Sequence, residues 1–121
     1  MNTSNEVYFS SLLKTDYPKV YRAIVDVLDR HSIKHGLLES TRDYWCRDYM
    51  PVQSGFHDYI QFVYHPDYLK KERQYETDST TVFDNAQALT GIAPTSSHLI
   101  ADGGNFTFCR SREGKPVIVM T

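Results

Sequence analysis

Segments with the period of a helix alternate with short strand-like segments along the 121 residues of this chain. The first helix is predicted to have Asp16 as its N-cap and Pro18 in its first turn, where the missing N–H costs nothing. Apolar residues recur at helical spacing up to His31, and Gly36 is predicted to follow the end of this helix. A short buried strand is predicted at 37–38.

The rest of the chain continues this alternation. Its predicted elements are a strand at 59–64, an exposed loop or short helical turn at 67–79, a helix from 80 or 81 to 90 that ends at Gly91, a loop at 94–96, a strand at 98–101, and a hairpin of 106–109 with 116–120. This order predicts one domain over residues 1–121, of the α/β class or of the α+β class with mixed strands.

Composition and charge disfavour several classes of partner. The net charge is −2 and no basic stripe is present, so nucleic-acid binding is not expected. No apolar run is long enough to cross a bilayer, and Met1–Glu6 lacks the start of a signal peptide, so the expectation is a cytoplasmic protein without a membrane partner. Cys46 and Cys109 form no CxxC pair, and they are either free thiols or one bridge.

The run Thr41–Pro51 has neither a helical nor a strand period and is predicted to be a loop. It contains Trp45, the only tryptophan, three residues before Asp48, with Arg47 beside the carboxylate. A carboxylate, an aromatic face and a rigid turn suit the recognition of a flat organic cation. The alternative is a surface loop in which Arg47 and Asp48 form an ion pair.

A second unusual segment is Asp102-Gly103-Gly104-Asn105, which the predicted strand 98–101 delivers. The glycine pair permits a positive φ or a close approach of another part of the backbone. A carboxylate at a strand end is a common place for an active-site group. The alternative is a tight turn that Asp102 closes with a side-chain hydrogen bond.

Two signatures in this order give the chain a resemblance to a known family. The run Trp45-Cys46-Arg47-Asp48-Tyr49-Met50-Pro51 resembles the W-x-R-D-x-x-P signature of the agmatine deiminase and bacterial-type peptidylarginine deiminase family, and Asp102-Gly103-Gly104-Asn105 resembles its acidic-Gly-Gly-Asn signature. The resemblance covers the chain from Leu12 onward. It implies a partial pentein fold, an α/β propeller, with one or two ββαβ-type modules.

The resemblance also implies the chemistry and the site. Members of the family hydrolyse a guanidinium group to a ureido group and ammonia, without a cofactor. Asp48 and Asp102 are the expected catalytic carboxylates; Asp48 would grip the guanidinium nitrogens, and Asp102 would orient a histidine. The expected substrate-binding residues are Trp45, Arg47, Gly103, Gly104 and Asn105. Agmatine, free arginine and peptidyl arginine stay open as substrates.

The family's catalytic histidine and cysteine are expected beyond this sequence. His65-Pro66-Asp67 matches the family's H-x-D letters, but it precedes the Gly-Gly turn and is interpreted as unrelated to catalysis. Cys46 is expected to pack in the core, and Cys109 is expected to be buried. The apolar strand that ends beside Thr121 predicts a piece of a longer enzyme, inactive alone.

Three further expectations complete the interpretation. His31 and His35 have the spacing of metal ligands on a helix, but no third ligand is evident, so no metal is expected. Exposed strand edges are expected to favour self-association. The rival functions are a non-catalytic module that binds a cation or a partner, and a purely structural domain.

Overall fold

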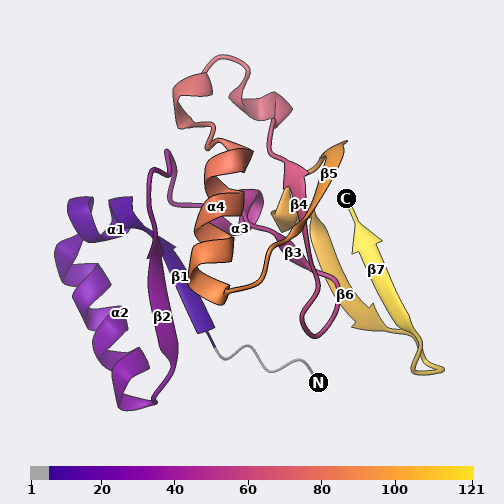
Figure 1. Cartoon of the computed structure of the whole chain (residues 1–121), viewed down its shortest axis with the longest axis horizontal. Coiled ribbons are helices and arrows are strands. Elements are labelled where there is room, and N and C mark those ends of the chain that lie inside the picture. The colour runs from indigo at the N-terminus through magenta and orange to yellow at the C-terminus, as the bar shows by residue number, and fades with distance from the viewer. Residues whose placement is uncertain (1–5) are drawn as a thin grey trace.

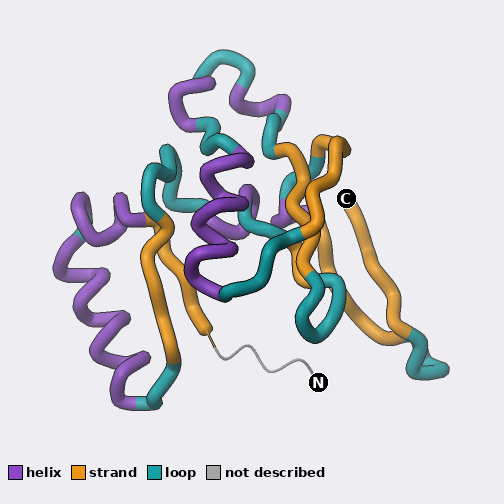
Figure 2. Tube along the Cα trace, in the orientation of Figure 1, coloured by secondary structure: helices purple, strands orange, loops and turns teal. Residues whose placement is uncertain are grey.

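A computed structural model describes residues 6–121 of the chain and shows a mixed α/β fold (Figures 1 and 2). The signal-peptide prediction concerns residues 1–6, of which 1–5 lie outside the described range. In chain order the elements are β1 (Glu6–Ser10), α1 (Ser11–Asp16), α2 (Pro18–Arg30), β2 (Lys34–Leu38), α3 (Cys46–Tyr49), β3 (Val52–Gln53), β4 (Tyr59–Val63), α4 (Ser79–Thr90), β5 (Thr95–Ile100), β6 (Phe106–Arg110) and β7 (Pro116–Met120), with short 3₁₀ helices η1 (Asp67–Leu69), η2 (Arg73–Tyr75) and η3 (Gly103–Asn105). None of the helices in the described range is long and apolar enough to cross a membrane.

The strands form three small sheets. β1 and β2 are parallel, and the two helices α1 and α2 supply the crossover that a parallel pair requires. β3, β4 and β5 form a mixed sheet in that order, in which β3 and β4 are antiparallel and α4 connects β4 to its parallel neighbour β5. β6 and β7 form an antiparallel hairpin, as predicted. Figure 1 shows α3 and α4 in the middle of the molecule, between the first sheet and the second.

The first helix begins and ends at different residues from those predicted. Asp16 is the last residue of α1, and Tyr17 is the N-cap of α2, with Pro18 in the first turn as expected. A residue before proline is disfavoured in the helical region, which explains the break at Tyr17. The prediction for Gly36 was wrong: it lies within β2, where an added Cβ would be 3.2 Å from side-chain atoms of Tyr8 and Leu89. Close packing of α4 on β2 explains this glycine.

The later elements agree more closely with the prediction. α4 ends at Gly91, whose φ of 72° is the left-handed conformation that glycine favours after a helix. Its N-cap is Asp78, whose carboxylate accepts from the backbone of Thr80 and Thr81. The predicted loop at 94–96 was wrong, because Thr95 already pairs with Ile60 in the sheet.

The core holds the first signature in place. Five buried side chains form it, and four partly buried ones pack against it: Leu38, Tyr49, Tyr64, Leu69 and Val82, then Tyr8, Cys46, Met50 and Leu89. The rings of Tyr49 and Tyr64 meet edge to face with their centroids 5.7 Å apart. Burial of a large apolar side chain is worth about 1.5–3 kcal/mol. Burial of Tyr49 in this core therefore anchors the segment Thr41–Pro51, which contains Asp48.

Candidate functional site

The first signature contains a one-turn helix, so the prediction of a loop was wrong at Cys46–Tyr49. The Asp43 carboxylate accepts a hydrogen bond from the Trp45 N–H at 2.9 Å and starts this turn. The Tyr49 hydroxyl donates to the Asp43 carbonyl at 2.7 Å and lies 3.3 Å from the Cys46 Sγ, with which it also forms a hydrogen bond. These bonds fix the backbone on both sides of Asp48.

The second signature packs directly against the first. A Cβ at Gly103 would lie 2.2 Å from the Arg47 carbonyl oxygen, and a Cβ at Gly104 would lie 2.2 Å from the Asp48 Oδ1. Neither glycine has a positive φ, so close approach, and not turn geometry, requires the absence of a side chain. The Asn105 N–H donates to the Asp102 carbonyl at 3.0 Å, so a backbone carbonyl closes this turn. The structure therefore brings Asp48 and Asp102 to one place.

The two carboxylates are partly buried and influence each other. Burial raises the pKa of Asp48, and the negative charge of Asp43 adds to this, while Arg47 and a hydrogen bond from Tyr68 lower it. The pKa of Asp102 is raised by burial and by the charge of Asp48. Within residues 6–121, no salt bridge involves either carboxylate. A bound cation would relieve the cost of ionising both groups.

Tyr68 and Asp43 belong to this site, and the sequence reasoning assigned neither to it. The hydroxyl of Tyr68 lies 3.0 Å from that of Tyr64. Burial raises the pKa of Tyr68, and the charges of Asp102, Asp48 and Asp43 raise it further. Buried Leu69 anchors η1, on which Tyr68 is 62% exposed. The sequence signal that could have indicated Tyr68 was its position four residues after Tyr64, at the end of β4.

Arg47 connects the site to the third sheet. Its Nη2 donates to the Phe106 carbonyl at 3.2 Å, and the guanidinium forms no salt bridge with Asp48. The alternative of a surface ion pair between Arg47 and Asp48 is therefore not observed. The ring of Phe106 stacks on Phe62 of β4 with centroids 5.1 Å apart. Arg47 thus holds α3 and β6 together at the edge of the site.

Trp45 lies beside a different hollow from the two carboxylates. It is 70% exposed and lines a surface hollow of about 550 Å³ together with Leu12, Asp16, Thr41, Arg42, Asp43, Tyr44, Gln74 and Tyr75. Asp48 and Asp102 are not lining residues of this hollow. Asp43 is common to both features, since it lines the hollow and raises the pKa of Asp48. Asn105 is exposed, and its carbonyl accepts from the Thr121 N–H at 3.3 Å.

The cysteines do not form a nucleophilic site in the described residues. Both are free thiols. Burial raises the pKa of Cys46, which is the opposite of what a thiolate nucleophile needs, and Cys46 packs against the core as predicted. The prediction that Cys109 is buried was wrong: it is exposed on β6 because nothing in the described range covers that side of the hairpin. None of the hydrogen bonds between residues 6 and 121 joins a cysteine to a histidine.

The structure separates the residues of both histidine motifs, His65-Pro66-Asp67 and the pair His31 and His35. His65 Nδ1 lies 2.8 Å from the Glu76 carboxylate, whereas Asp67 pairs with Lys70 at 2.8 Å. His31 is the C-cap of α2 and His35 lies in β2, so the prediction that they share a helix was wrong. The chain turns between them at Ser32, whose φ is 53°. No group of three or more metal-ligating side chains occurs in the range 6–121.

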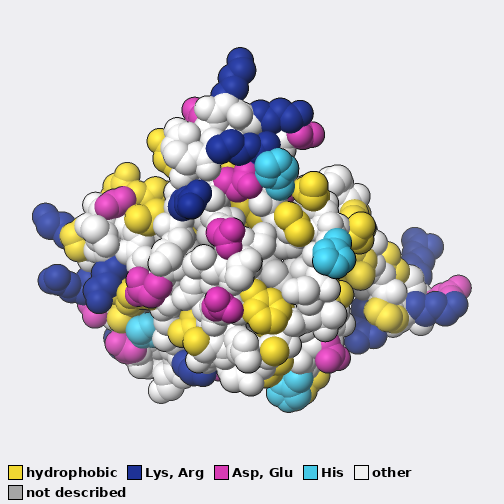
Figure 3. Space-filling view, turned by 45° about the horizontal axis from the view of Figure 1, so that its top comes forward, with side chains coloured by type: hydrophobic (Ala, Val, Ile, Leu, Met, Phe, Trp, Pro, Cys, Tyr) yellow, Lys and Arg dark blue, Asp and Glu magenta, His cyan; other side chains and the backbone are white. Residues whose placement is uncertain are grey.

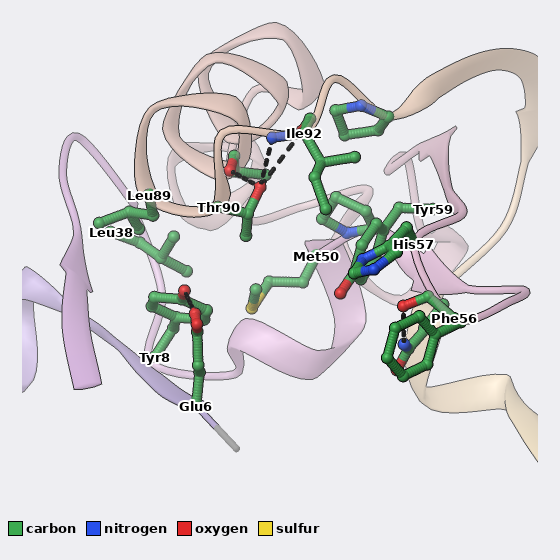
Figure 4. A pocket seen from close by; sticks show the side chains of 14 residues that line it. Glu6, Tyr8, Leu38, Met50, Phe56, His57, Tyr59, Leu89, Thr90 and Ile92 are labelled. Atoms are coloured by element: carbon green, nitrogen blue, oxygen red, sulfur yellow. Dashed lines mark hydrogen bonds between the residues drawn. The ribbon is translucent and has the colours of Figure 1, made fainter. Parts of the chain in front are cut away.

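A second cavity, of about 440 Å³, lies between the first sheet, α4 and the β3–β4 loop (Figure 4). In the close view, the Met50 side chain extends into it between Tyr8 on one side and His57 and Tyr59 on the other. Its one carboxylate, Glu6, is already bound by Lys34 at 3.0 Å and by the Tyr8 hydroxyl. The cavity is mainly apolar, and its lining contains neither Asp48 nor Asp102.

The surface charge distribution is compatible with a cationic ligand. On the face drawn in Figure 3, acidic side chains are spread over the middle of the molecule and most Lys and Arg side chains lie around its outline. The net charge of the whole chain is only −2, so long-range attraction of a cation is weak. The local carboxylates therefore dominate.

Comparisons with known proteins identify no relative: no family model, no curated protein and no solved structure matches this chain. The geometry of the site is therefore the basis for assigning a function.

Proposed function

We propose that this chain binds a guanidinium cation between Asp48 and Asp102 and is the N-terminal portion of a deiminase. The observation that carries the proposal is the pair itself. Two partly buried carboxylates lie together against a glycine turn, each has a raised pKa, and neither forms a salt bridge in the described range. A site that lacks only its positive charge is suited to a cation from outside.

The shape of the cation follows from the donors and acceptors. A guanidinium is planar and carries five N–H groups in a fixed arrangement, so carboxylates on two sides can each accept two of them. The Tyr68 hydroxyl donates to Asp48, and its oxygen is free to accept a further N–H. Trp45 lines the adjoining hollow together with Asp43. Its aromatic face could contact the part of the substrate that extends from the guanidinium past Asp43.

The order of elements supports the pentein part of the proposal. β3, β4, α4 and β5 follow one another as ββαβ and form one small mixed sheet. β6 and β7 begin a second antiparallel pair after η3. In this arrangement Asp102 lies at the junction between the first ββαβ unit and the next pair, which is a natural place for a site built from several modules.

In deimination a thiolate attacks the guanidinium carbon, and ammonia leaves with a proton that a histidine supplies. Water then attacks the same carbon, which releases the ureido product and the thiolate. The raised pKa of Cys46 and the absence of a Cys–His hydrogen bond in the described range support binding without turnover for this chain. The same observations favour the alternative, a non-catalytic cation-binding module. A cytoplasmic setting fits two free thiols.

Isothermal titration with agmatine and with an Nα-acylated arginine amide tests the proposal. Both ligands carry the guanidinium, and a preference between them selects a small-molecule or a peptidyl substrate. Asp48→Asn and Asp102→Asn are expected to weaken binding at least about tenfold, as loss of a charged hydrogen-bond partner does. Asp67→Asn is the matched control, because Asp67 is an exposed carboxylate paired with Lys70.

Two outcomes are informative beyond affinity. Equal binding by wild type, Asp48→Asn and Asp67→Asn would contradict the proposed site, and no binding by any of the three would favour a purely structural domain. Ureido product from the 121-residue chain would show that it contains its own nucleophile, and the binding-only interpretation would then be wrong. Binding without product agrees with the proposal.

A further inference from the structure

The outer strand of the β6–β7 hairpin is an open and uncharged edge. In the described residues, β7 pairs with β6 alone. Figure 1 shows β7 on the outer side of the molecule. Its apolar side chains are exposed on both faces of the hairpin, from 36% for Val117 to 64% for Met120. Such an edge is a template for another strand.

The hydrogen bonds of the hairpin show which backbone groups are already used. Ser111 N–H donates to the Lys115 carbonyl at 2.9 Å, and Thr121 N–H donates to the Asn105 carbonyl at 3.3 Å. In an antiparallel pair, hydrogen-bonded positions alternate with non-bonded ones. The odd-numbered residues of β7 therefore direct their backbone groups to β6.

The even-numbered residues of β7 direct their backbone groups to the open side. Ile118 and Met120 present an N–H and a carbonyl there. Pro116 presents a carbonyl only, and because its nitrogen faces outward, the proline removes no bond from the hairpin.

One outward backbone group on the opposite edge of the hairpin is already used. Arg47 donates to the outward carbonyl of Phe106, and the Phe106 ring stacks on Phe62 of β4. The outward groups of β7 have no such contact in the described residues, so β7 is the freer of the two edges.

We propose that β7 pairs with β7 of a second copy of this chain in an antiparallel register centred on Ile118. Ile118 lies opposite Ile118 of the second copy, and the two exchange N–H and carbonyl in both directions. Val117 lies opposite Val119, and the Met120 N–H donates to the Pro116 carbonyl at each end. Every outward N–H of β7 then has an acceptor.

The charges of the hairpin support a second copy as the occupant and fix its direction. β7 has no charged side chain, so self-pairing places no like charges opposite each other. The turn region carries Arg110, Arg112 and Lys115 against a single acid, Glu113. Antiparallel pairing puts the two positive turns at opposite ends, whereas parallel pairing would bring them together. The two-fold arrangement uses the β7 edge of each copy, so this contact is closed and joins only two copies.

The side chains also match in this register. Phe108 and Ile118 are cross-strand partners on one face of the hairpin, and both are about half exposed, at 49% and 54%. In the pair, the two copies of Ile118 lie between the two copies of Phe108 and form one apolar row across four strands. The proposal is independent of cation binding.

Sedimentation velocity of the 121-residue chain tests this pairing. We expect a species of twice 14.0 kDa at micromolar concentration. Ile118→Lys and Ile118→Glu each place like charges at the two-fold axis, and each is expected to weaken dimerisation at least about tenfold. A mixture of the two variants is expected to restore the dimer, because residue 118 of one copy then faces the opposite charge on the other.

The control and a second variant complete the test. Thr107→Lys adds the same charge to β6 and is expected to remain dimeric. Ile118→Pro removes only an outward N–H and is expected to be a folded monomer. A wild-type chain that stays at 14.0 kDa at every concentration, or a mixture that does not restore the dimer, would overturn the proposal. A series of larger species would also contradict it, since the proposed pair is closed.

Discussion

The Asp48 carboxylate lies against the backbone of Gly104 so closely that one added carbon at this glycine would be 2.2 Å from Oδ1. The two signatures, more than fifty residues apart, therefore have a shared steric requirement. Gly103 has the same relation to the Arg47 carbonyl oxygen, also at 2.2 Å. Gly104 thus contacts a side chain, which can rotate, whereas Gly103 contacts the backbone, which cannot.

Gly104→Ala is expected to impair cation binding more than stability, and Gly103→Ala is expected to do the reverse. The Asp48 side chain can rotate away from a new methyl group, but it then leaves the site. The Arg47 carbonyl cannot move without displacing α3, so Gly103→Ala is expected to cost about 2–4 kcal/mol of unfolding free energy. Urea denaturation and agmatine titration of both variants check this.

The control for both substitutions is Gly114→Asn. Gly114 has a φ of 76° and open space around its Cβ position, and asparagine tolerates this conformation. We expect neither binding nor stability to change by more than about 1 kcal/mol. Equal effects of Gly103→Ala and Gly104→Ala on both properties would contradict the assigned packing.

Asp48→Asn is expected to make the protein more stable at neutral pH while it removes binding. The folded-state pKa of Asp48 is raised above 3.8, chiefly by burial and then by Asp43. A raised carboxyl pKa gives stability that is complete below the unfolded pKa and is lost as pH rises through the folded pKa. The asparagine variant has no such loss, so its advantage should appear above about pH 4 and remain small, about 0.5 kcal/mol or less because solvent screens the site.

Asp67→Asn should change stability in the opposite direction from Asp48→Asn. Its hydrogen bond and ion pair with Lys70 lower the pKa of Asp67, so this carboxylate contributes stability above its unfolded pKa that is lost as pH falls. The variant is expected to be less stable than wild type at pH 7 and equal to it in acid. Chemical denaturation of all three proteins from pH 3 to 8 measures the differences. A wild-type advantage over Asp48→Asn at pH 7 would contradict the assigned pKa direction.

Tyr49→Phe is expected to destabilise the fold by about 1–2 kcal/mol. The change leaves the Asp43 carbonyl without the donor at 2.7 Å and frees Cys46 from its hydrogen bond. Tyr75→Phe is the matched control, because Tyr75 is 47% exposed. Thermal unfolding compares them, and equal melting temperatures for the two variants would argue against the anchoring role of Tyr49.

Cys109 should react with a thiol reagent at pH 7 well before Cys46. Cys109 is exposed, whereas burial raises the pKa of Cys46 and reduces its thiolate fraction. Mass-spectrometric peptide mapping of the alkylated chain follows both sites. Rapid labelling of Cys46 in the folded protein would contradict its packing against the core and would reopen its interpretation as a nucleophile.

Local patterns were sufficient for much of this fold. Gly91 marked the end of α4, and the hairpin of β6 and β7 was predicted from two short segments on either side of the turn at 111–115. The start of β5 was missed because Thr95-Ser96-Ser97 has no apolar pattern, and its pairing with β4 is a long-range contact. Gly36 was also misassigned because of a long-range contact: Leu89 of α4 packs so closely on it that an added Cβ would lie only 3.2 Å away.

The site was predictable in part. Asp48 and Asp102 were predicted as site residues from their two signatures and the resemblance that these carry. The structure brings their segments together, and their role stays a prediction. Tyr68 and Asp43 were not predicted, because their proximity to Asp48 depends on η1 and on the turn before Trp45. Trp45 was assigned to the same pocket as Asp48 from its spacing and from the resemblance, and it lines the neighbouring hollow.

The most direct test of the cation site is an NMR titration of the Asp48 and Asp102 carboxyl carbons, with and without saturating agmatine. In the free chain, both carboxyls are expected to titrate above the ordinary aspartate value of 3.8. Agmatine is expected to lower both pKa values, because a bound cation favours the ionised form. Ordinary or lowered values in the free chain, or values that saturating agmatine leaves unchanged, would contradict the account.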